Sequence, residues 1–151
     1  MQLSPRLINT FLIAKLPSAY FCGVRVSAID EAHCIVKVRH KWINQNPFKS
    51  MYFAVQAMAA ELSTGALVMS AIRRNSKPVS MLVVSNKGNF VKKATGLITF
   101  KCVDGARISE AIAAAITSGE MQTIWLKSTA TDSSGAIVSE MVFEWSIKVK
   151  P

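Results

Sequence analysis

The sequence predicts an α+β domain in which a curved antiparallel sheet wraps around one long helix. First, residues 50–74 form an apolar stretch with too few polar positions to lie on a protein surface as a helix. Second, six other segments have strand-like composition, and short links join them in pairs, which favours antiparallel pairing. Third, 151 residues suit a single domain with a sizeable core, so we expect one domain over residues 1–151.

The central stretch carries a single charge. Between Met51 and Ile72 the only charged residue is Glu61. The length would suit a membrane span, but alanines and scattered polar residues dilute the stretch, so we predict no span. These polar residues are Gln56, Ser63, Thr64 and Ser70. A central helix over 50–74, enclosed by protein, therefore carries one carboxylate into a dry environment.

The N-terminal part predicts a helix and two strands. Ser4-Pro5 is a helix-starting pair, and helical spacing of apolar residues continues to Pro17, which predicts a helix within residues 1–17. Alternating patterns predict strands over 21–28 and 34–41. The largely polar stretch 42–47 forms a loop before the central helix, because a residue that precedes proline resists helix.

The C-terminal part predicts four strands and a short helix. Strands are expected over 79–90 and 97–103, and apolar spacing predicts a helix over 108–117. The segments 121–131 and 136–149 form a hairpin across Asp132-Ser133-Ser134-Gly135. A curved antiparallel sheet around one apolar helix is the economical way to bury that helix, and this arrangement is the hotdog fold.

Composition restricts the classes of function. The net charge of +9 favours an anionic partner, but basic and aromatic residues do not interleave along one surface, so we expect no nucleic-acid binding. Three cysteines and two histidines without ligand spacing predict no metal site. The N-terminus lacks a convincing signal peptide, which with free cysteines predicts a reduced, cytoplasmic protein.

One motif adds a family resemblance. The run from Asn46 to Ala54, continuing through Ala57 and Ala60 to Glu61, resembles the signature of hotdog acyl-CoA thioesterases of the phenylacetyl-CoA type. Those enzymes have Asn or Gln in the loop and, fifteen residues later, Asp or Glu on the helix, as Asn46 and Glu61 are spaced here. The resemblance extends from about Arg39 to the C-terminus and is greatest to an uncharacterised branch of the superfamily.

The resemblance implies a catalytic site. Glu61 would act as general base or nucleophile, Asn46 would orient the water or the carbonyl, and backbone amides around Tyr52 and Phe53 would bind the developing oxyanion. The family's His-Gly-Gly turn is replaced here by Tyr52-Phe53-Ala54. Two structural alternatives stay open: Glu61 as a paired buried acid, and Asn46-Pro47 as the cap and first turn of the helix.

The resemblance also implies an acyl-CoA-like ligand and an assembly. Coenzyme A would enter as part of the substrate, without a separate cofactor, and basic residues would lie near its phosphates: Lys87, Lys92, Lys93, Arg73 and Arg74. Family members join their sheets edge to edge with the pocket between subunits, so we expect a homodimer or a dimer of dimers. The alternative function is a non-catalytic hotdog module that binds an acyl ligand or serves dimerisation.

Overall fold

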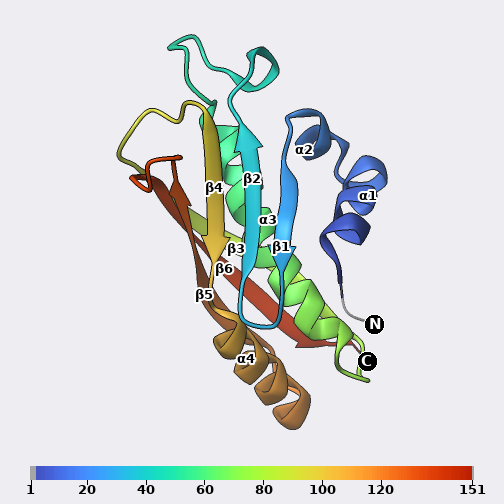
Figure 1. Cartoon of the computed structure of the whole chain (residues 1–151). Coiled ribbons are helices and arrows are strands. Elements are labelled where there is room, and N and C mark those ends of the chain that lie inside the picture. Colours follow the sequence, from blue (N-terminus) through green and yellow to red (C-terminus); the bar gives the residue numbers. More distant parts are fainter. Residues whose placement is uncertain (1–2, 151) are drawn as a thin grey trace.

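The computed structural model describes residues 3–150, so positions 1, 2 and 151 of the expected domain and of its N-terminal helix lie outside the described residues. Six strands form one curved sheet, and the longest of the four α-helices lies at its centre (Figure 1). In chain order the elements are α1 (Pro5–Lys15), α2 (Pro17–Phe21), β1 (Arg25–Ile29), β2 (Cys34–Arg39), the 3-10 helix η1 (Trp42–Asn44), α3 (Phe53–Arg73), β3 (Val79–Phe90), β4 (Leu97–Cys102), α4 (Gly105–Ser118), β5 (Gln122–Thr131) and β6 (Ile137–Val149).

The sheet is antiparallel in every pairing and has the order β1-β2-β4-β5-β6-β3. The hairpins β1–β2 and β5–β6 confirm the predicted pairing of neighbours. The expected pairing of β3 with β4 is wrong, because β3 pairs with β6 and β4 lies between β2 and β5. A strand pattern specifies which face is buried and leaves the choice of neighbour to the rest of the sheet.

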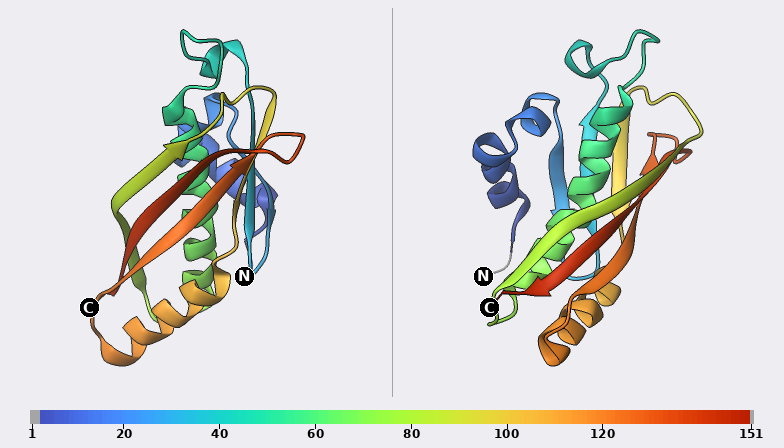
Figure 2. Two further views of the ribbon diagram at one scale, coloured as in Figure 1. Left: turned by 90° about the vertical axis from the view of Figure 1, so that its left-hand side faces the viewer. Right: turned by 180° about the vertical axis from the view of Figure 1, so that it is seen from behind.

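The central helix α3 is enclosed as the sequence predicts. Thirteen of its 21 residues are buried, including the polar Ser63 and Thr64. By length and composition the helix could cross a membrane, but two thirds of its most apolar window (67%) is buried by the rest of the chain. Figure 2 shows the sheet curving around it, with β3, β5 and β6 crossing it obliquely. The fold is therefore the predicted hotdog arrangement.

The helix begins later than predicted, at Phe53 and not at residue 50. The Met51 amide donates to the Ala94 carbonyl at 2.8 Å, and the Tyr52 amide donates to the Asn44 carbonyl at 2.9 Å. These long-range hydrogen bonds hold the preceding segment extended, so the first helical turn starts only after them.

The N-terminal segment forms two helices where one was predicted. The Ser4 hydroxyl caps α1 by accepting from the Leu7 amide at 3.3 Å. After α1 ends at Lys15, Pro17 starts the short helix α2, a position where its fixed φ suits a first turn. The strand predicted from residue 21 therefore begins only at Arg25.

The two edges of the sheet differ in what covers them. Along the β1 edge, the Asn9 side chain of α1 accepts from the Val26 amide and donates to the Val26 carbonyl, each at 2.9 Å. At the opposite edge β3 pairs only with β6, and Leu82 and Val84 on β3 are 68% and 55% exposed. Within residues 3–150, one edge is thus partly capped by the chain and the other is open.

Candidate functional site

Two cavities lie against the central helix. The first, here the N-terminal cavity, has about 410 Å³ and lies at the start of α3; its lining comprises Asn46, Phe48, Ser50, Met51, Phe53, Gln56, Phe90, Val91, Lys92, Lys93 and Ala94. The second, here the Glu61 cavity, has about 110 Å³ and lies between α1, the middle of α3 and β3; its lining comprises Ile8, Phe11, Leu16, Glu61, Leu62, Gly65, Ala66, Met69 and Met81.

Glu61 is the one charged residue in the lining of its cavity. No hydrogen bond or ion pair joins its carboxylate to another side chain or amide in residues 3–150. Gly65, one turn later, leaves room for the carboxylate, because a Cβ atom there would lie 3.1 Å from Glu61 Oε1. Burial raises the pKa of Glu61 above that of an ordinary glutamate. The interpretation of Glu61 as a paired structural acid therefore finds no partner in the described chain.

Asn46 closes the loop that leads to the helix. Its Oδ1 accepts from the amides of Phe48 at 2.9 Å and Ser50 at 3.2 Å, and its Nδ2 donates to Ser50 Oγ at 3.0 Å. Because α3 starts only at Phe53, the alternative that Asn46-Pro47 caps the helix is wrong. The half-buried Asn46 lies instead on the wall of the N-terminal cavity.

The first amides of α3 divide into used and free donors. The Tyr52 amide is bonded to the Asn44 carbonyl, whereas the amides of Phe53 and Ala54 have no hydrogen-bond acceptor within residues 3–150. Both lie at the N-terminus of a 21-residue helix, where the helix dipole favours negative charge. The Phe53 side chain also lines the N-terminal cavity and packs edge-on against Phe90, with 6.3 Å between ring centroids. The free amides at this end of the helix, and hence the candidate oxyanion donors, are thus those of Phe53 and Ala54.

The catalytic candidates and the basic candidates are spread over several places in one chain. Asn46 and Glu61 line different cavities. Lys92 and Lys93 line the N-terminal cavity, where Lys92 also pairs with Asp132 and Lys93 donates to the Phe48 carbonyl at 3.3 Å.

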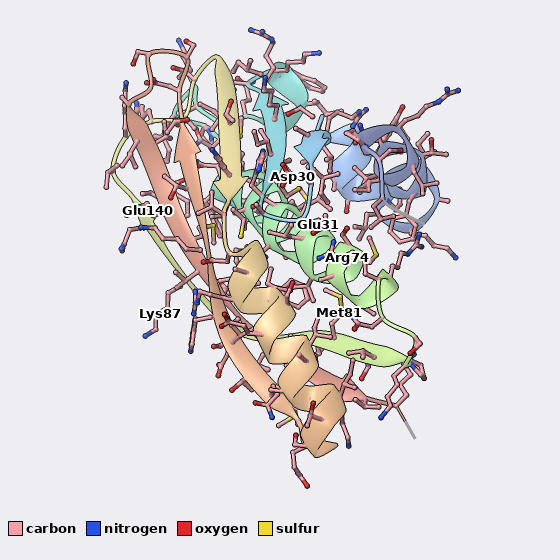
Figure 3. The ribbon with its side chains drawn as sticks, turned by 60° about the horizontal axis from the view of Figure 1, so that its bottom comes forward. Asp30, Glu31, Arg74, Met81, Lys87 and Glu140 are labelled. Carbon is pink, nitrogen blue, oxygen red and sulfur yellow. The ribbon has the colours of Figure 1, made fainter. Side chains whose placement is uncertain are left out.

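The remaining basic candidates line neither cavity. Arg73 and Arg74 are at the far end of α3, roughly 30 Å from its start at 1.5 Å per residue. Arg74 lies 3.9 Å from the Glu31 carboxylate, and Lys87 lies over the Trp125 ring at 5.8 Å from its centroid. Figure 3 shows Arg74 beside Glu31 and well apart from Lys87.

Two contributions to the cavities were not predicted from the sequence. Residues of the N-terminal segment (Ile8, Phe11, Leu16) line the Glu61 cavity, although the family resemblance begins only near residue 39. Gln56, one of the polar residues of the central stretch, accepts from Ser139 Oγ at 2.9 Å and also lines the N-terminal cavity. The amphipathic spacing of α1 was the available signal for the first. No local sequence pattern indicated that Gln56 lines the N-terminal cavity.

Metal-binding groups are not clustered in the part of the chain that the structure describes. Within residues 3–150, no three His, Cys, Asp or Glu side chains lie together as a metal ion would need. The chemistry that these residues offer is therefore that of one desolvated carboxylate, free helix amides and an apolar cavity.

Solved structures match this fold over nearly its whole length. A protein of unknown function from Pseudomonas aeruginosa, a probable thioesterase, has a TM-score of 0.87 at 22% identity and covers 99% of each chain. A protein of unknown function from Chlorobaculum tepidum has a TM-score of 0.81 at 14% identity, again over 99% of each chain. A thioesterase from Haemophilus influenzae has a TM-score of 0.74 at 10% identity, over 99% of this chain and 93% of that one. At such identities the likeness establishes the fold.

No curated protein matches the sequence. A protein family described as a domain of unknown function, DUF4442, matches residues 5–147. That match covers all the strands but for the last residues of β6, and it includes both cavity-lining helices. The chain therefore belongs to the DUF4442 family, a family with a thioesterase-like hotdog fold and unknown function.

Proposed function

We propose that the protein hydrolyses the thioester of acyl-CoA or of a related acyl carrier, with Glu61 as general base or nucleophile. The observation that carries this proposal is an unpaired carboxylate in an otherwise apolar cavity, on the central helix of a thioesterase-like hotdog fold. A desolvated, unpaired carboxylate is costly to keep, and such groups are concentrated at functional sites.

The chemistry follows from the position of the carboxylate. As a base, Glu61 takes a proton from water while the hydroxide oxygen adds to the thioester carbon. The carbonyl oxygen becomes an oxyanion, which helix amides such as those of Phe53 and Ala54 stabilise. The carbon–sulfur bond then breaks, and the thiolate leaves with the proton that Glu61 returns. The apolar walls of the Glu61 cavity suit the acyl group beside the reacting carbon.

A homodimer would bring the N-terminal cavity of one protomer beside the Glu61 cavity of its partner. β3 is twelve residues long and, among residues 3–150, no strand pairs with its outer edge. Antiparallel pairing of β3 with its copy would bring the Phe90 end of one strand to the Met81 end of the other. Phe90 lines the N-terminal cavity and Met81 lines the Glu61 cavity, so each site would combine Asn46 from one protomer with Glu61 from its partner. A dimer of dimers would keep the same pair.

The same pairing would gather basic residues around the ligand. Two antiparallel copies of α3 would bring the Arg73–Arg74 end of one helix toward the N-terminal cavity of the other. There, Lys92 and Lys93 already line the wall. These four residues are the proposed partners of the coenzyme A phosphates, which enter with the substrate. Lys87 lies over the Trp125 ring, so it would contact only the outer end of the ligand.

Replacing Glu61 by Gln tests the proposal. Hydrolysis of an acyl-CoA panel should fall by about a hundredfold or more, because a positioned general base is lost while the shape of the side chain is kept. Glu110→Gln, on the exposed face of α4, is the matched control and should hydrolyse like the wild type. A folded Glu61→Gln protein with unchanged hydrolysis would exclude the catalytic role.

The second candidate is an acyl-binding module without hydrolysis. The observation in its favour is the Phe53 ring, which lines the N-terminal cavity beside the free amides, where thioesterases of the resembled type have glycine. Under this reading the wild type binds a fluorescent fatty acid but turns over no thioester. Phe53→Gly, which clears the space, would then gain hydrolysis without losing the bound probe.

A further inference from the structure

The loop between β2 and α3 has an inverted distribution of polarity. Trp42, Ile43 and Phe48 are 83%, 54% and 71% exposed, whereas Asn44 is only 2% exposed. We name these three exposed residues the loop tip. Figure 1 shows η1 and the segment after it projecting beyond the upper end of the sheet. The loop thus places apolar side chains in solvent and a polar side chain inside, opposite to the usual preference.

Hydrogen bonds hold the loop in this form. Asn44 Nδ2 donates to the carbonyls of Cys22 and Arg39, each at 2.9 Å, and its Oδ1 accepts from the Lys41 amide at 2.8 Å. The bonds from Asn46 to the Phe48 and Ser50 amides fix the second half of the loop. These hydrogen bonds therefore hold the loop tip in place, and exposed apolar side chains held in this way mark an interaction surface.

The charges that the loop segment itself carries are all of one sign. From Cys34 to Ala60 the chain contains four lysines and arginines and no aspartate or glutamate. Lys41 and Lys49 are exposed and flank the tip on either side. The partner that fits is anionic at its surface and apolar just below it. A second copy of this loop fits poorly, because a two-fold contact would oppose lysines to lysines.

We propose that the loop tip docks the protein on an anionic phospholipid surface. Trp42, Ile43 and Phe48 enter the interfacial layer of the bilayer, and Lys41 and Lys49 contact the headgroup phosphates. Asn46 and Phe48 also line the N-terminal cavity, so docking places the mouth of that cavity at the lipid surface. The proposal concerns binding to a membrane face and stands whether or not the protein hydrolyses thioesters.

Vesicle flotation tests the docking. The full-length wild type should float with vesicles of phosphatidylcholine and phosphatidylglycerol, and much less with phosphatidylcholine alone. Combined replacement of the loop tip (Trp42→Ser, Ile43→Ser, Phe48→Ser) should weaken partitioning by at least about tenfold, since the buried apolar area is lost. Lys41→Ala or Lys49→Ala should each weaken it about fivefold on the anionic vesicles.

Matched controls separate docking from general stickiness. Val103→Ser with Met121→Ser removes apolar side chains that are 65% and 56% exposed elsewhere on the surface, and should float like the wild type. Lys148→Ala removes one exposed positive charge from β6 and should have little effect. Circular dichroism of each variant verifies that it is folded.

Tryptophan fluorescence gives a second readout at the tip itself. Trp145 is buried and Trp125 is 38% exposed, so the blue shift on vesicle addition should come mainly from Trp42 and be lost in Trp42→Phe. A wild type that stays in solution with both kinds of vesicle overturns the proposal. So does a folded triple-serine variant that floats like the wild type. A triple-serine variant that turns from dimer to monomer, with no flotation of the wild type, would show that the loop is a contact between subunits.

Discussion

The two edges of the sheet differ in whether other parts of the chain cover them. At the β1 edge, the Asn9 side chain makes both an accepting and a donating hydrogen bond to Val26, as a neighbouring strand would. At the β3 edge, a twelve-residue strand has no partner on its outer side within residues 3–150, and the side chains of Leu82 and Val84 are exposed. An unpaired edge is a template for another strand. β3 is therefore the edge at which the strand of a second molecule can pair.

The Glu61 cavity depends on both edges. One wall comes from α1, which contributes Ile8 and Phe11 and also carries the capping residue Asn9. The opposite wall includes Met81, near the start of the open strand β3. Changes at either edge should therefore affect the proposed site. A change at β3 acts through the pairing of subunits, and a change at the β1 edge acts through the stability of the wall that α1 forms.

The largest effect is expected from a proline on the open edge. Val84 sits at a bulge in β3 and has no partner in the register with β6, so proline there spares the ladder inside the subunit. It should disturb pairing with a second copy and convert a dimer to a monomer, as measured by light scattering. If the site is shared between subunits, hydrolysis should fall about a hundredfold because catalytic groups are separated.

The control for this prediction is Val84→Ala, which keeps the amide and should remain dimeric and active. A wild type that is monomeric at micromolar concentration would contradict both the assembly and the shared site. A dimeric Val84→Pro protein would show that the subunits meet elsewhere.

A smaller effect is expected from removing the cap of the closed edge. Asn9→Ala loses two hydrogen bonds to Val26 and should lower the free energy of unfolding by about 2 kcal/mol, at about 1 kcal/mol each. Urea denaturation measures this difference. Thr10→Ala, whose hydroxyl bonds only within α1 to the Arg6 carbonyl, is the control and should change it by less than about 0.5 kcal/mol. Equal losses for the two variants would mean that the edge cap contributes nothing of its own.

The smallest effect concerns pH and the carboxylate between the edges. Because burial raises the folded-state pKa of Glu61, protonation of this group contributes to the stability of the folded wild type. That contribution is complete below the ordinary glutamate pKa and is lost as pH rises through the raised pKa. Glu61→Gln should therefore melt at a modestly higher temperature than the wild type near neutral pH, and this gain should shrink in acid.

Melting curves of both proteins across that pH range measure the effect. A Glu61→Gln protein that melts markedly lower at neutral pH would mean that the carboxylate has a stabilising partner in the assembled protein. Hydrolysis gives an independent reading, because a base must be ionised. The rate should rise with pH through the raised pKa.

Local patterns predicted most of the elements because their causes are local. The alternation in the last strand reflects burial of one face, and the observed β6 shows that alternation, while the bounds of β3 match the predicted strand over 79–90. The site was predicted less completely. Spacing singled out Asn46 and Glu61, but no local pattern could show that they line separate cavities of one chain or that α1 walls the second.

The apolar pattern of residues 50–74 is enough to predict an enclosed central helix with one carboxylate in it, because a helix that is apolar all round cannot be stable in water. The choice of neighbouring strands, the start of α3 and the pairing of Glu61 follow from the folded chain. They depend on residues far apart in the sequence, such as the Met51 amide that donates to the Ala94 carbonyl, and Phe11 and Glu61, which line one cavity. Periodicity carries no information about such contacts, because it records which face is buried and not what buries it.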